Sequence, residues 1–193
     1  MLSISNAEAV DTGDRILAAA ASCVRDFGVD RVTLAEIARR AGVSRPTVYR
    51  RWPDTRTILA ALLTERVVGA WRECPSRGTG REALVGRIVE VADRLRRDDM
   101  ILTVLRAAPE LAMVYITDRL GASQQVLIDM VAEEIRKAQG DRSIRKGDPR
   151  ELASMVLLFT QSVVQSGQIV EEILDAEARA AELCRALNGY LQP

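Results

Sequence analysis

The sequence predicts an all-α protein of about nine helices, packed as a small N-terminal domain and a larger C-terminal domain. Hydrophobic residues make up 48% of the 193 residues, yet aromatic residues only 4%, so Leu, Val, Ile, Ala and Met must form the core. Gly (12) and Pro (6) are sparse, and apolar residues recur at spacings of three and four along most of the chain. This composition and period are typical of helices packed on helices.

The N-terminal region is expected to contain a tail and then two helices. Residues 1–13 are polar, which predicts a flexible tail. Apolar residues from Ile16 to Phe27 predict a first helix that starts near Asp14, and Gly28 suits its end. The stretch Thr33–Glu36 has the pattern of a capping box, in which Thr33 accepts from the Glu36 amide and the Glu36 carboxylate reaches back.

A tight corner follows the short second helix. Gly42 can adopt a positive φ, Ser44 is placed to cap a third helix, and Pro46 fits the first turn of that helix. Two short helices joined by such a corner form a helix-turn-helix, whose second helix enters the major groove of DNA. The sequence therefore predicts a DNA-binding domain over residues 14–58.

The charge distribution supports this interpretation. The chain has a formal net charge of zero, but the segment from Arg31 to Arg56 contains seven arginines against only Glu36 and Asp54. That segment therefore carries a net charge of +5 and the rest of the chain −5. This distribution indicates that one short region is suited to bind a polyanion.

The expected DNA contacts come from the starts of the second, third and fourth helices. Arg45 can pair bidentately with guanine, Thr47 can reach a phosphate or a thymine methyl, and Arg50 projects from the same side. The other members serve mainly as caps or phosphate contacts. The full set is Thr33, Ser44, Arg45, Thr47, Tyr49, Arg50, Arg51 and Arg56. Arg39 and Arg40 are expected to be solvated surface residues.

The second domain is expected over residues 59–193, with two final helices at about 151–170 and 175–191. Its Met, aromatic and Gln residues admit two interpretations, an ordinary core or surface and a small-molecule pocket. The candidate pocket residues are Met100, Val104, Met113, Ile116, Gln125, Met155, Phe159, Gln161 and Ser162.

Several classes of protein are disfavoured. The chain contains no His, so histidine metal sites and Ser-His-Asp triads are excluded, and we expect no catalytic residues, metal or cofactor. The three cysteines are far apart in the sequence, which favours reduced thiols in a cytoplasmic protein. No apolar run is long enough for a membrane span, so no membrane association is expected.

Residues Arg15 to Leu63 resemble the N-terminal domain of the tetracycline-repressor (TetR) family. The matching segments are Ile16–Ala20, Cys23–Gly28, Thr33, Ile37–Ser44 and Thr47–Trp52. Two positions depart from the family pattern: Trp52 stands where Phe is usual, and Thr55 replaces a Lys that typically contacts a phosphate. Arg56 is the neighbouring residue that could substitute for this Lys.

The resemblance implies a homodimeric repressor that binds a palindromic operator in double-stranded DNA. It implies dimerisation through the last two helices and release from DNA by a small apolar or amphipathic effector. Repression is the family's common mode, and the residues themselves do not separate a repressor from an activator. The alternative is a small-molecule-binding module that has lost specific DNA reading; the +5 segment disfavours it.

Overall fold

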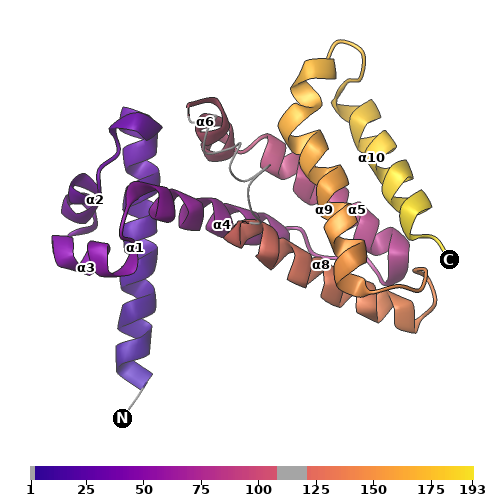
Figure 1. The fold of residues 1–193 in the computed structure, drawn as a ribbon, viewed down its shortest axis with the longest axis horizontal. Helices are drawn as coiled ribbons and strands as arrows, with labels where there is room; N and C mark the ends of the chain where they lie inside the picture. The colour runs from indigo at the N-terminus through magenta and orange to yellow at the C-terminus, as the bar shows by residue number, and fades with distance from the viewer. Residues whose placement is uncertain (1–2, 108–120) are drawn as a thin grey trace. The chain divides into compact units, whose positions relative to one another are not determined.

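The structure, a computed structural model, describes residues 3–107 and 121–193, with only the backbone at residues 3–11 and 105. The described residues form α-helices and short 3-10 helices, nine of the former (Figure 1), which confirms the all-α prediction. No helix among them has the length and apolar composition needed to cross a membrane. The described residues divide into two compact units, residues 3–65 with 99–107 and 121, and residues 66–98 with 122–193.

The first unit is built from the N-terminal helices and a later helix. Its elements are α1 (Ser3–Phe27), η1 (Val29–Arg31), α2 (Leu34–Ala41), α3 (Arg45–Arg51), the first half of α4 (Thr55–Glu73) and α6 (Asp99–Ala107). Helix α2 packs on α1 and on α3, and α6 packs against α1 and η1. The unit thus contains the expected helix-turn-helix, but it extends past residue 58 and takes in α6.

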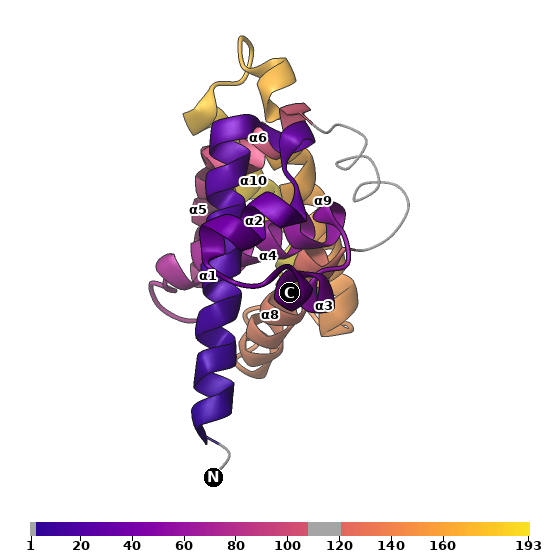
Figure 2. The same ribbon diagram turned by 90° about the vertical axis from the view of Figure 1, so that its left-hand side faces the viewer.

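Helix α1 begins at Ser3, earlier than the expected start near Asp14, so residues 3–13 have helical backbone where a flexible tail was expected. Figure 2 shows α1 running past α2 and α3 towards the N-terminus. A helix of 25 residues is about 37 Å long, which leaves its first turns beyond the helices that pack on it.

The core of the first unit contains two residues that we had expected in a ligand pocket. Met100 and Val104 of α6 are buried with Ile16, Ile37 and Leu62 in one hydrophobic cluster. The period of α6 indicated a buried face but not the core in which that face would lie. Met100 and Val104 therefore belong to the core of the first unit.

The second unit contains the remaining long helices. These are the second half of α4, α5 (Gly80–Arg96), α8 (Ala122–Gly140), α9 (Pro149–Ser166), η3 (Gly167–Val170) and α10 (Ala176–Leu191). Helix α5 packs against α8, α9 and α10, and α9 is flanked by α8 and α10 (Figure 1). The two final helices lie close to the predicted ranges.

A buried arginine closes the corner between α9 and α10. Arg179 of α10 is almost fully buried, and its Nη1 donates to the carbonyl oxygens of Gly167 (3.1 Å) and Leu174 (2.9 Å). A Cβ on residue 167 would lie 2.9 Å from the Cδ of Arg179, so only glycine fits there without a shift. The side chain of Asp175 caps α10 by accepting from the Ala178 amide. The corner is therefore held at both ends by hydrogen bonds.

Candidate nucleic-acid interface

Local capping defines the start of α3. The Ser44 hydroxyl accepts from the Thr47 amide (3.3 Å) and lies 2.7 Å from the Thr47 hydroxyl. Pro46 occupies the first turn, where no helical hydrogen bond is lost. Ser44 and Pro46 thus have the structural roles that the sequence predicted. The hydroxyls of Ser44 and Thr47 lie together at the start of the helix.

The corner before α3 has the expected left-handed residue. Gly42 has φ 64° and ψ 35°, and its amide hydrogen-bonds to the end of α2. Arg15 of α1 donates to the Ala41 carbonyl at 2.7 Å, which satisfies one of the free carbonyls at the C-terminus of α2. Arg15 was not among the candidate residues, because its partner lies 26 positions away in sequence.

One side of α3 is packed and the other faces solvent. Val48 is completely buried, and Trp52, which follows the helix, is buried as well. Arg45, Tyr49 and Arg50 are exposed. An exposed face with two arginines and a tyrosine, fixed by a buried valine, has the chemistry of a helix that reads a major groove.

The remaining candidates lie at neighbouring helix starts or against other side chains. Thr33 caps α2 and is exposed, and its hydroxyl accepts from the Glu36 amide at 3.2 Å. Arg56 is exposed in the first turn of α4. The Arg51 guanidinium lies over the Trp52 ring, with its carbon 5.1 Å from the ring centroid, and close against Gly13 of α1. The structure thus places Arg51 against protein surfaces as well as solvent.

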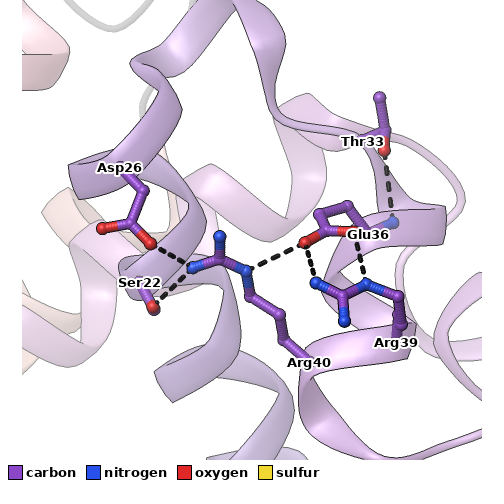
Figure 3. Close-up of polar contacts among 6 residues, drawn as sticks. All are labelled: Ser22, Asp26, Thr33, Glu36, Arg39 and Arg40. Carbon is purple, nitrogen blue, oxygen red and sulfur yellow. Dashed lines mark hydrogen bonds and ion pairs between the residues drawn. The ribbon is translucent and has the colours of Figure 1, made fainter.

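A network of charges joins α2 to α1 (Figure 3). The Glu36 carboxylate accepts from Arg39 (2.8 and 2.6 Å) and from the Nε of Arg40 (3.0 Å). Arg40 Nη1 donates to the Ser22 hydroxyl (2.8 Å) and to the Asp26 carboxylate of α1. These bonds from two arginines lower the pKa of Glu36 to about 2.

This network corrects two expectations. The Glu36 carboxylate binds arginines, and only the Thr33 half of the capping box is formed as predicted. Arg40 is not a solvated surface residue, because its side chain is 20% exposed against 70% for Arg39. The spacing of Glu36 and Arg40 was a visible signal for an ion pair within α2, but nothing in the spacing indicated Asp26 as a partner.

The candidate pocket residues are dispersed. Met113 and Ile116 lie outside the described residues, and Met100 and Val104 lie in the first unit. On α9 the side chains of Met155, Phe159 and Ser162 are exposed, as is Gln125 on α8. Gln161 is half-buried and accepts from the Gln124 side-chain amide at 2.6 Å, which joins α8 to α9.

Comparison with known proteins agrees with this geometry. The family model described as bacterial regulatory proteins, tetR family, matches residues 16–62. The HTH-type transcriptional regulator Rv2250c of Mycobacterium tuberculosis is 64% identical over 191 residues, which cover 99% of this chain and 100% of that protein.

Solved structures show the same fold. The TetR-family transcriptional repressor QsdR of R. erythropolis superposes with a TM-score of 0.71 at 17% identity, covering 94% of this chain and 96% of that one. RolR in complex with the ligand resorcinol gives a TM-score of 0.67 at 15% identity, covering 96% of this chain and 90% of that one. The capped helix-turn-helix, the matched family pattern and the full-length relative lead to one conclusion: the chain is a transcriptional regulator of the TetR family.

Proposed function

We propose that this protein is a ligand-responsive repressor that binds a palindromic operator as a homodimer and is released by a small apolar or amphipathic effector. The observation that carries the proposal is the orientation of α3. Its valine is completely buried and its arginines and tyrosine face solvent. This is the arrangement that lets a recognition helix present its N-terminal residues to base edges.

The proposed contacts divide into base reading and phosphate binding. Arg45, in the first turn of α3, is proposed to pair with guanine O6 and N7. The hydroxyls of Thr33, Ser44, Thr47 and Tyr49 and the guanidinium groups of Arg50, Arg51 and Arg56 are proposed to bind phosphates, with Thr47 also within reach of a base. Phosphate binding by several arginines makes the affinity strongly salt-dependent.

The proposed dimer interface is formed by α9 and α10. Met155, Leu158 and Phe159 expose apolar surface on α9, and the Phe159 ring contacts Tyr190 of α10 edge to face, with centroids 5.7 Å apart. A two-fold axis would pair this surface with its copy and bury these side chains. The same axis would present two recognition helices to the two halves of a palindrome.

The proposed effector site lies in the second unit. The Gln124–Gln161 hydrogen bond joins two packed helices, and each of them also buries apolar residues, including Ile128 and Val156. A polar pair within apolar surroundings suits a small ligand with one hydrogen-bonding group. RolR, a protein of similar fold, binds the small ligand resorcinol.

The test is a mobility-shift experiment with the DNA upstream of the protein's own gene, a scrambled competitor and two salt concentrations. The proposal predicts a shift that the scrambled DNA does not compete and that weakens steeply with salt. A dimeric, folded protein that selects neither this DNA nor any duplex from a random library would contradict it. That result would favour the ligand-binding module without DNA reading.

A further inference from the structure

We propose that Arg40, which does not belong to the expected DNA-contacting set, is a positioning residue for DNA reading. It fixes α2 on α1 and thereby sets the angle at which α3 is presented. The inference rests on the proposed function in one respect, that α3 reads DNA. It concerns a different property of the domain, namely what holds the recognition helix in place.

The guanidinium of Arg40 uses two of its nitrogens on two different helices (Figure 3). Nε donates to Glu36 of the same helix, while Nη1 donates to Ser22 and Asp26 of α1. Its carbon also lies 4.6 Å from the centre of the Phe27 ring at the end of α1. A planar fork with fixed nitrogen positions therefore sets both the distance and the rotation between α2 and α1.

A second contact from α1 holds the same end of α2. Arg15 of α1 donates to the carbonyl of Ala41, the last residue of α2. Arg15 and Ser22 are seven positions apart, so the two attachment points are about 10 Å apart along α1. Two separated attachments prevent α2 from pivoting, which one attachment would not. The corner at Gly42 follows α2 directly and leads into α3, so the position of α2 determines the position of α3.

The alternative role for Arg40 is long-range attraction to DNA. A comparison with Arg39 distinguishes this role from positioning. Arg39 has the same charge and lies next to Arg40 on α2, and its hydrogen bonds to Glu36 stay within α2. Loss of either arginine removes one positive charge from the domain. Only loss of Arg40 removes the bonds to α1, so the difference between the two variants measures positioning.

A substitution of Asp26 is a test in which long-range attraction and positioning predict opposite changes in DNA affinity. Asp26→Ala removes a negative charge from a domain that binds a polyanion, so charge alone predicts tighter DNA binding. The positioning role predicts weaker binding to a selected duplex, by about threefold to tenfold, because Arg40 loses its charged partner on α1. Asp14→Ala is the matched control: the same substitution on the same helix, outside the network of Figure 3.

The experiment uses the full-length protein and a duplex that the wild type selects from a random library, with scrambled DNA as the second probe. Arg40→Gln is expected to lose about tenfold more affinity for the selected duplex than Arg39→Gln, and both are expected to lose equally on scrambled DNA. Arg40→Lys keeps the charge but not the fork, so it is not expected to restore binding. Thermal unfolding shows at which temperature all variants are folded.

Hydrogen exchange of the free protein gives a readout that needs no DNA. The amides of α2 and α3 are expected to exchange faster in Arg40→Gln than in Arg39→Gln, with the second unit unchanged. Equal exchange in the two variants, equal loss of duplex binding, or tighter binding by Asp26→Ala overturns the positioning role. A wild type that selects no duplex contradicts the proposed function instead, and the exchange comparison then decides the role of Arg40 alone.

Discussion

The arginines of the DNA-binding unit divide into two kinds at the scale of single residues. Arg45 and Arg50 face solvent from α3, whereas Arg15 and Arg40 form hydrogen bonds between α1 and α2. All four contribute equally to the positive charge of the unit. Charge counting therefore locates the DNA-binding surface but does not show which arginines touch DNA.

Arg45→Ala is expected to cost about 1–3 kcal/mol of binding free energy on the operator, because a bidentate contact to guanine is lost. Titration of labelled operator and of scrambled DNA measures the cost. Arg56→Ala is the control, since loss of its proposed phosphate contact is expected to weaken binding to both duplexes alike. An equal loss on both duplexes for Arg45→Ala would assign Arg45 to phosphate binding.

The ion pairs of Glu36 predict a pH dependence of folding stability. Its pKa falls from an ordinary value of 4.5 to about 2, so the pairing stabilises the folded state fully above pH 4.5. That contribution is lost as the pH falls from about 4.5 to about 2, where the folded state also takes up the proton. Urea unfolding of Glu36→Gln between pH 7 and 2.5 is expected to show a shallower loss of stability than the wild type. Glu65→Gln, at an exposed position on α4, is the control, and parallel curves for wild type and Glu36→Gln would contradict the prediction.

At the scale of elements, the corner between α2 and α3 depends on one backbone conformation. A Cβ on Gly42 would meet only the Arg15 side chain, at 3.4 Å, so the positive φ and not crowding makes glycine necessary. Gly42→Ala is expected to lower the free energy of unfolding by about 1–2 kcal/mol. Gly69→Ala, in α4 with open space around it, is expected to raise it by about 0.5–1 kcal/mol. Chemical denaturation of both variants tests this, and two changes of the same sign would refute the backbone explanation.

The helix-turn-helix could be predicted residue by residue because its signals are local. Thr33, Gly42, Ser44 and Pro46 each act within three or four positions of their partners. The start of α1 could not be predicted in this way, because residues before Asp14 carry no apolar stripe. Ala7, Glu8 and Ala9 are good helix formers, and a helix already nucleated by the packed part of α1 can propagate through them.

At the scale of the whole molecule, the order of elements along the sequence does not show to which hydrophobic core an element belongs. Helix α6 follows α5 directly, yet it belongs to the first unit while α5 belongs to the second. Its apolar period was correct and its assignment to the second domain, with Met100 and Val104, was not. The partner of Arg40 on α1 was hidden for the same reason, since Asp26 lies 14 positions away. Periodicity specifies a buried face, whereas long-range pairing needs the fold.

The proposed dimer predicts the effect of a charge on α9. Leu158 is 57% exposed in the single chain, and Leu158→Glu is expected to raise the dissociation constant of the dimer about thirtyfold or more, as loss of an interface hot spot does. Sedimentation over a range of protein concentrations measures this. Gly86→Glu, which adds the same charge at an exposed position of α5, is expected to leave the dimer unchanged. A dimer equally stable in both variants would place the interface elsewhere.

The buried Arg179 has a consequence for the rate of subunit exchange in the proposed dimer. Because its bonds to the Gly167 and Leu174 carbonyls lock the turn between α9 and α10, both helices of the proposed interface are already ordered in the separate chain. Association then loses little conformational entropy, and the gain appears mainly as a longer lifetime of the complex. In the proposed dimer, two copies of this chain would therefore stay paired for long times and exchange slowly with free copies.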